Sequence, residues 1–220
     1  MNNRIVSAFI GLVVLLASSG SVFGAGGGTT LQHANVNIRD TAAIQRGAQL
    51  FVNYCLSCHS ASYMRYNRLA EDLDLDEDLV MDNLVFADVK IGETMDIAMR
   101  PEDAESWLGK APPDLSLISR SRGADWLYTY MLTFYQDEAG GWNNLALPNA
   151  SMPHVMWQKQ GIQKPVYATH DGVETVDHLT LAKPGLQSPE EYEDSIRDLV
   201  TFLEYLGEPA KIKRKNIGVW

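Results

Sequence analysis

The chain has 220 residues, of which 45% are hydrophobic, and this suits one domain with a real core and some insertions. Its formal net charge at pH 7 is −10. That charge argues against nucleic-acid binding, because phosphates would repel the protein. It favours solubility and a cationic partner.

Residues 1–24 have the pattern of a secretory signal peptide. Arg4 supplies a positive start, residues 5–17 are almost wholly apolar, and small residues precede a cleavage point expected near Gly24. An uncleaved N-terminal anchor is the alternative, although the apolar run is short for a membrane span. The pattern indicates export from the cytoplasm, and we expect residues 25–38 to form an N-terminal linker.

Residues 39–210 are expected to form the main domain, which begins with a helix. The helical pattern starts near Asp40 or Thr41, and either side chain could cap it. Gly47 inside this helix costs about 1 kcal/mol of helix stability relative to Ala. A close crossing by another helix would compensate for that cost.

The predicted helix ends in Cys55-Leu56-Ser57-Cys58-His59, which contains both cysteines of the chain. The spacing Cys-x-x-Cys-His is typical of covalent attachment of a c-type haem, with the histidine as proximal iron ligand. A structural zinc site would need a second pair of ligands. A thioredoxin-like redox pair would need a βαβ context, and a disulfide between residues this close would be strained.

An acidic stretch follows the motif. It is either the solvated face of a helix or loop, or a docking surface that attracts a basic electron carrier by charge. The candidate docking residues are Asp72, Asp74, Asp76 and Glu77. Pro101 then suits the first position of another helix.

The block Ala111-Pro112-Pro113-Asp114-Leu115-Ser116 interrupts regular structure. Asp114 could cap the segment that follows. Arg120 and Arg122 come next and could pair with haem propionates, since a guanidinium forks onto a carboxylate; surface arginines are the alternative. An aromatic and apolar helix is predicted over residues 125–135.

The loop around Met152 offers candidates for the sixth position of a haem iron. A proline-flanked loop can place a thioether over the ring, and Met152 is the strongest candidate. His154 is its rival, and an open position would suit peroxidase or gas-binding chemistry. The weaker candidates are Met95, Met99 and Met156.

The C-terminal part contains a short hairpin and a well-delimited helix. The hairpin is predicted over residues 166–181 around Asp171-Gly172. Ser188-Pro189-Glu190-Glu191 is a capping box, and the helix that it opens ends at Gly207 and Pro209. This helix is the natural partner of the one that carries Gly47.

Taken together, these motifs resemble the cytochrome c1 family, the haem subunits of quinol–cytochrome c reductases, in a proteobacterial form. The resemblance covers most of the chain after the leader. The Pro-Pro-Asp-Leu-Ser block and the Gly207-Glu208-Pro209 ending with its basic tail are its more specific parts.

The resemblance implies a mostly α fold of the class I cytochrome c type, with insertions and a small hairpin. It implies one covalent haem c on Cys55 and Cys58, with His59 and Met152 as iron ligands. It also implies that Arg122, then Arg120, meets a propionate and that Pro113 belongs to the cofactor-binding residues.

The resemblance further implies an electron-transfer subunit that is no enzyme by itself. It would share a complex with cytochrome b and the Rieske iron–sulfur protein at the periplasmic face of the inner membrane. It would receive electrons from the Rieske protein and pass them to a soluble cytochrome c. The alternatives are a free periplasmic carrier of the same fold and, third, a haem peroxidase with an exchangeable site.

The C-terminal end departs from the family pattern. Residues 211–220 form a basic segment, in which only five residues follow Lys215, too few to span a bilayer. The family carries a single membrane helix here, so we expect Ile217-Gly218-Val219-Trp220 to begin an anchor that continues in a longer gene product.

Overall fold

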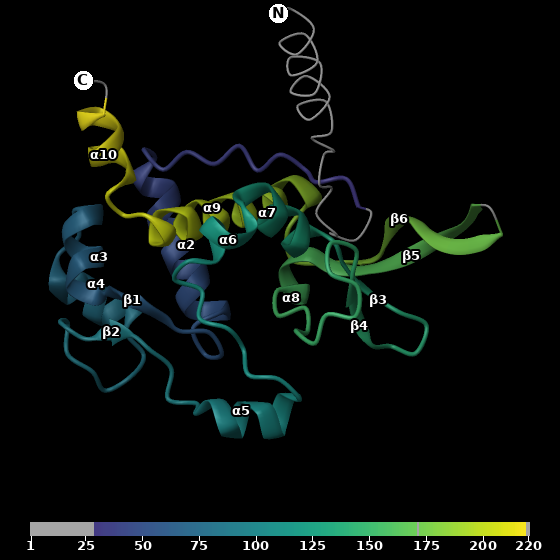
Figure 1. Ribbon diagram of the computed structural model, residues 1–220, viewed down its shortest axis with the longest axis horizontal. Helices are drawn as coiled ribbons and strands as arrows, with labels where there is room; N and C mark the ends of the chain where they lie inside the picture. Colours follow the sequence, from purple (N-terminus) through teal and green to yellow (C-terminus); the bar gives the residue numbers. More distant parts are fainter. Residues whose placement is uncertain (1–28, 171, 219–220) are drawn as a thin grey trace, which may run out of the picture.

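A computed structural model describes residues 29–170 and 172–218 (Figure 1). The predicted signal peptide and its cleavage point lie outside these residues. The architecture is a set of helices around one long helix pair, with a two-stranded hairpin extending from one end (Figure 1).

The pair consists of α2 (Thr41–Tyr54) and α9 (Pro189–Gly207). Asp40 caps α2, as one of the two predicted caps, by accepting a 3.0 Å hydrogen bond from the backbone N–H of Ala43. The capping box predicted at Ser188 is present at the start of α9. Both helices therefore begin where local sequence signals placed them.

Gly47 lies at the crossing of the two helices. A Cβ atom on Gly47 would come within 2.1 Å of the Asp198 carbonyl oxygen and 2.7 Å of the Phe202 side chain. Beside this contact, Arg46 makes two hydrogen bonds to the carboxylate of Asp198, at 2.6 and 2.9 Å. The close crossing expected from Gly47 is confirmed.

The first half of the domain after the cysteine motif consists of short elements. They are β1 (Ala61–Arg65), α3 (Tyr66–Leu73), α4 (Glu77–Leu84), β2 (Thr94–Met95), α5 (Pro101–Leu108) and α6 (Ile118–Arg122). Strands β1 and β2 pair antiparallel. Helix α5 begins at Pro101 as predicted, and it stands away from the other helices (Figure 1).

The second half surrounds the N-terminal part of α9. It contains α7 (Ala124–Leu132), β3 (Phe134–Gln136), β4 (Trp142–Asn144), α8 (Trp157–Gln160), β5 (Gly161–His170) and β6 (Val173–Pro184). Strands β3 and β4 form one antiparallel pair, and β5 and β6 form the projecting hairpin. Helix α10 (Lys211–Ile217) follows α9.

Three expectations about the fold need correction. The helix predicted over residues 125–135 ends at Leu132, because Phe134 and Tyr135 pair with β4 as a strand. The hairpin is longer than residues 166–181, since its strands run from Gly161 to Pro184. Three two-stranded sheets occur in the described part of the chain, so the fold is mixed rather than mostly α.

Residues 29–38, expected as part of a linker, lie along α7 and α9 (Figure 1). The Asp125 carboxylate accepts a 2.9 Å hydrogen bond from the Ala34 N–H, and Arg197 donates to the Ala34 carbonyl at 3.2 Å. Gln32 donates its backbone N–H to Thr129 at 2.8 Å. These long-range bonds fasten the segment to the domain.

The core joins the helix pair to both halves of the domain. Phe51 of α2 and Phe202 of α9 are fully buried, with ring centroids 5.4 Å apart. Leu69 and Met95 close the core on one side and Phe134 on the other, all without exposed surface. Within residues 29–170 and 172–218, no helix is long and apolar enough to cross a membrane.

Candidate haem site

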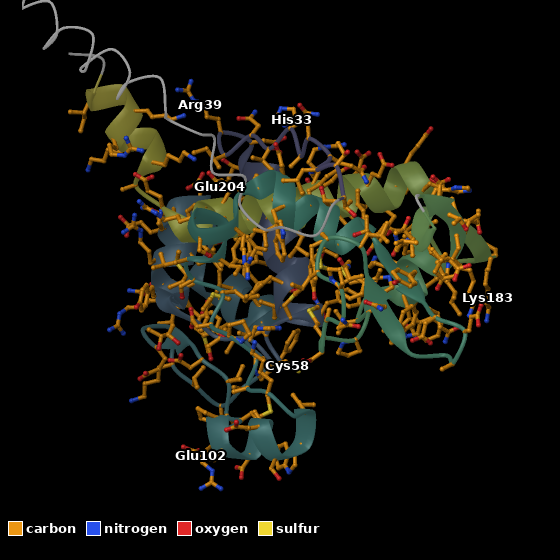
Figure 2. All side chains as sticks on the ribbon, turned by 45° about the vertical axis from the view of Figure 1, so that its right-hand side comes forward. His33, Arg39, Cys58, Glu102, Lys183 and Glu204 are labelled. Atoms are coloured by element: carbon orange, nitrogen blue, oxygen red, sulfur yellow. The ribbon has the colours of Figure 1, made fainter. Side chains whose placement is uncertain are left out.

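The cysteine motif forms a tight turn at the C-terminal end of α2. The N–H of Cys55 donates to the Phe51 carbonyl at 2.8 Å, and the N–H groups of Cys58 and His59 both donate to the Cys55 carbonyl, at 3.0 and 2.9 Å. These bonds fix the spacing of the two thiols and the imidazole. Cys58 lies on the side of the helical body toward α5 (Figure 2).

Both thiols are free, and Cys55 is buried whereas Cys58 is partly exposed. Burial, with a smaller contribution from Cys58, raises the pKa of Cys55 to about 12. A thiol of that kind is a poor redox nucleophile. The environment therefore argues against a thioredoxin-like pair, and two free thiols at this spacing fit covalent attachment to a porphyrin.

One ring nitrogen of His59 is already hydrogen-bonded to the backbone. Its Nδ1 lies 2.7 Å from the carbonyl oxygen of Pro113. A carbonyl can only accept, so Nδ1 carries the proton and Nε2 is left with its lone pair. Burial lowers the pKa of His59, and the bond to Pro113 opposes that shift. The tautomer is the one that a metal-binding imidazole needs.

The Pro-Pro-Asp-Leu-Ser block runs alongside the cysteine motif. The N–H of Leu115 donates to the Ser60 carbonyl at 2.8 Å. The Asp114 carboxylate accepts from the N–H groups of Ser62 and Ser116, at 2.9 and 2.8 Å. Asp114 thus caps the segment that follows it through Ser116, as predicted, and also joins that segment to the one that contains Ser62.

The charge of Asp114 is stabilised by these contacts. Burial alone would raise the pKa of Asp114, but hydrogen bonds from Ser116 and Ser62 together lower it below its ordinary value. The N–H of Tyr63 adds a 3.1 Å bond to the hydroxyl of Ser116. We call these bonds of Asp114 to Ser62 and Ser116 the clamp of Asp114. Sequence reasoning missed the bond to Ser62, because the two residues are 52 positions apart.

Met152 and its rivals occupy different environments. Met152 is half-buried against the core, whereas Met95 and Met156 have no exposed surface. Met99 is half-buried in the loop before α5. The imidazole of His154 is 1% exposed and lies face to face with the Phe134 ring, with centroids 4.9 Å apart. The methionine at position 152 is therefore the less enclosed of the two candidate ligands.

The ring of His154 is held neutral by its surroundings. Burial lowers the pKa of His154 to about 4. Neither ring nitrogen of His154 has a hydrogen-bond partner among the described residues.

One contact connects the segment that follows Met152 with the cysteine motif. Lys159, in the helix that follows the loop, lies 5.8 Å from the centroid of Tyr54, the last residue of α2. The loop and the motif therefore belong to the same end of the helix pair.

The two arginines have separate partners. The Nη1 atom of Arg120 lies 3.9 Å from the Glu208 carboxylate at the end of α9. The guanidinium of Arg122 lies over the Trp126 ring, 4.8 Å from its centroid. A propionate contact by either residue stays a prediction.

The acidic candidates are not equivalent. The Asp72 carboxylate accepts a 2.6 Å bond from Arg68 and a 2.8 Å bond from the Tyr205 hydroxyl, so it serves as a link between α3 and α9. Asp74, Asp76 and Glu77 are exposed. In the part of the chain that the structure describes, no three His, Cys, Asp or Glu side chains gather as a metal site.

Comparisons with known proteins agree on one family. The chain matches the Cytochrome C1 family over residues 32–220. It is 44% identical to a protein of Allochromatium vinosum named cytochrome c1, covering 93% of this chain and 86% of that relative. A Nitrosomonas europaea protein named ammonia monooxygenase gamma subunit is 43% identical, covering 96% and 87%. The mitochondrial cytochrome c1 haem protein of Saccharomyces cerevisiae is 27% identical, covering 82% and 60%.

Proposed function

The chain belongs to the cytochrome c1 family, and from this premise we propose which residues carry its haem and which partners exchange electrons with it. The family carries a covalently bound c-type haem and serves as an electron-transfer subunit of the cytochrome bc1 complex. Haem iron supplies one-electron chemistry when it is bound.

Cys55 and Cys58 hold the haem by thioether bonds, and His59 Nε2 is the proximal ligand. The observation that carries this assignment is the 2.7 Å contact between His59 Nδ1 and the Pro113 carbonyl. This hydrogen bond fixes the plane of the ring and leaves the lone pair of Nε2 free to bind a metal. The two free thiols belong to the same turn as this imidazole.

Met152 is the second axial ligand. Its half-buried thioether belongs to an irregular loop, and Lys159, in the helix after that loop, lies against Tyr54 at the end of α2, next to Cys55. A thioether raises the reduction potential and closes the iron to small molecules, which suits a relay rather than a peroxidase. Arg122 and Arg120 remain the proposed propionate partners.

The partners follow from the family and from the two ends of the chain. The donor is the Rieske iron–sulfur protein, cytochrome b belongs to the same complex, and a soluble cytochrome c is the acceptor. The leader pattern supports a location at the periplasmic face. The basic residues of α10 would suit the head-group level of an anionic membrane, beside a C-terminal anchor.

The experiment is purification through an affinity tag on this chain from membranes of a strain that matures c-type haem. The complex should contain cytochrome b and the Rieske protein and should reduce cytochrome c with quinol. A control chain with Cys55→Ser and Cys58→Ser should give no such activity at equal expression. Recovery of the tagged chain as a free periplasmic protein, or in a complex that oxidises ammonia and not quinol, would contradict the proposal.

A further inference from the structure

The chain around Met152 has little backbone support of its own. On its N-terminal side, Asn143 Oδ1 accepts a 2.8 Å hydrogen bond from the Asn149 N–H. On its C-terminal side, the Trp157 N–H donates to the His154 carbonyl at 3.3 Å. Among the described residues, no hydrogen bond reaches residues 150–153. The position of the thioether therefore depends on side chains that fasten the loop at its two ends.

His154 is the nearest such side chain after Met152. Its ring is parallel to that of Phe134, with 2° between the planes and 4.9 Å between the centroids. The ring of Trp142 meets it edge-on at 5.3 Å, and Tyr192 does so at 6.4 Å. These three aromatic residues, Phe134, Trp142 and Tyr192, are called the aromatic box below.

The aromatic box is itself rigid, because each wall belongs to a different packed element. Phe134 of β3 is fully buried, and Trp142 of β4 pairs across the sheet with Gln136. Tyr192 of α9 is 2% exposed and donates its hydroxyl to the Met131 carbonyl at 3.1 Å. A side chain inserted among them is fixed to β3, β4 and α9 together.

Stacking, rather than hydrogen bonding, holds the imidazole. Neither ring nitrogen has a partner at hydrogen-bond distance among residues 29–170 and 172–218, and Gln160 Oε1 has none either. The Gln160 amide is held in place from its other side, where Nε2 donates to the Leu132 carbonyl at 2.9 Å. The ring face against Phe134 is therefore the closest ring contact that His154 makes.

We propose that His154 is a positioning residue, whose insertion into the aromatic box holds the Met152 thioether at the iron. The inference rests on the proposed function, in which Met152 is the axial ligand. His154 lies two residues beyond Met152, so loss of its stacked ring would free residues 150–153, which no hydrogen bond among the described residues holds. The thioether would then leave the iron more often and admit external ligands.

The test compares the haem-loaded variants His154→Ala, His154→Phe and Phe134→Leu with the wild-type protein. Two quantities are measured in the ferric state: the intensity of the weak thioether-to-iron band and the rate of cyanide binding. Leu73→Ala is the matched control, because Leu73 is also buried, at 1% exposed, but belongs to α3 at the other end of the domain. Melting temperatures are recorded for all of them.

Removal of the ring should weaken the thioether band and speed cyanide binding roughly tenfold or more, as for other groups that orient a metal ligand. Phe134→Leu should change both readouts in the same direction, and His154→Phe should keep both close to wild type, since it retains a stacked ring. Leu73→Ala should lower the melting temperature and leave both readouts unchanged.

Wild-type readouts in His154→Ala and Phe134→Leu, or equal acceleration by Leu73→Ala, would overturn the role of His154 and leave Met152 as the ligand. A wild-type protein without the thioether band would contradict the Met152 assignment itself, and the role of His154 with it.

Discussion

At the scale of single residues, His59 has the most determined environment of the candidate site. An imidazole has two ring nitrogens that could bind a metal. In His59, Nδ1 lies 2.7 Å from the Pro113 carbonyl oxygen, so only Nε2 is available as a ligand. Proline is well suited to this role because its ring fixes φ, so the carbonyl lies on a stiff segment. The proximal nitrogen is thereby defined before any ligand is bound.

Asp114 stabilises the same segment through its charge. The Asp114→Asn variant should lose about 1 kcal/mol of unfolding free energy at pH 7, a modest value because Asp114 is exposed. Since the pKa of Asp114 is lowered in the folded state, its stabilising effect is full above the unfolded pKa of about 4. It is lost as the pH falls through the lower, folded pKa.

Urea denaturation of both proteins between pH 7 and pH 3 measures this contribution. The difference between wild type and Asp114→Asn should be constant near neutrality and should shrink only below about pH 4. A difference that is already absent at pH 7 would show that the clamp contributes nothing to stability.

Met152→Ala should lower the reduction potential of the haem and abolish the thioether band, because the loss of a thioether ligand removes the stabilisation that it gives to reduced iron. His154 should not replace it, since its ring stays stacked on Phe134. The open position should therefore bind carbon monoxide when reduced.

Met99→Ala is the matched control for that variant, because Met99 is also half-buried in a loop. Redox titration and the reduced spectrum under carbon monoxide measure both variants. An unchanged potential in Met152→Ala, or a loss of the band in Met99→Ala, would move the axial ligand to another residue.

At the scale of elements, the crossing of α2 and α9 determines where the motif lies. The Gly47 contact with the Asp198 carbonyl allows the two backbones to approach, and the paired bonds from Arg46 to Asp198 hold them there. Cys55 follows α2 directly, so the position of α2 against α9 determines where the haem-binding residues lie.

Gly47→Ala should destabilise the protein by roughly 1–3 kcal/mol, the usual cost of overpacking, even after the gain in helix propensity from alanine. The added methyl group would lie 2.1 Å from a backbone oxygen, and backbone cannot move aside as a flexible side chain can. Chemical denaturation measures the change. Gly92→Ala is the control, because a Cβ atom there has nothing within 4 Å; equal stability of the two variants would refute the close crossing.

The elements that sequence reasoning predicted well are those with local signals. Asp40 and the capping box at Ser188 mark helix starts through contacts within three residues. The aromatic stripe of α7 continues to Phe134 and predicts a helix there, whereas pairing with strand β4, which follows after a short turn, makes residues 134–136 a strand. The predicted hairpin omits both of its ends, where Pro165 and Pro184 do not fit the usual residue pattern of a strand.

At the scale of the whole molecule, some acidic side chains bind other elements of the fold and others form an exposed acidic surface. Asp72 joins α3 to α9 through Arg68 and Tyr205. Asp74, Asp76 and Glu77, which lie just beyond it, are exposed and remain the candidate docking surface for a basic cytochrome. Sequence alone could not separate these roles, because Tyr205 is 133 residues away from Asp72.

The triple variant Asp74→Asn, Asp76→Asn, Glu77→Gln should slow reduction of a basic cytochrome c at low salt, and the difference should vanish at high salt. Asparagine is chosen at position 74 because this residue has a positive φ of 54°, which asparagine tolerates. Stopped-flow rates over a range of ionic strength measure the effect.

Glu138→Gln, Glu174→Gln and Glu193→Gln together form the control for the triple variant. All three are exposed, and the triple variant changes the net charge equally. Glu138 lies in the turn between β3 and β4, Glu174 in β6 and Glu193 near the start of α9, all outside the segment 74–77. Identical salt dependence in the two triple variants would assign docking to some other surface.

The candidate site was predictable as far as its chemistry is local. The spacing alone predicts a haem-attachment motif at Cys55, Cys58 and His59. The bond from His59 to the Pro113 carbonyl joins residues 54 positions apart, and that from Ser62 to Asp114 joins residues 52 positions apart. The aromatic box brings three elements together around His154, so no sequence spacing reveals it.

The optical spectrum of the haem-loaded protein, with and without carbon monoxide, tests the central claim of a closed relay between His59 and Met152. We expect a c-type spectrum with the thioether-to-iron band in the ferric state and no change when carbon monoxide is added to the reduced protein. A spectrum without that band that shifts under carbon monoxide would contradict the relay and indicate an exchangeable site.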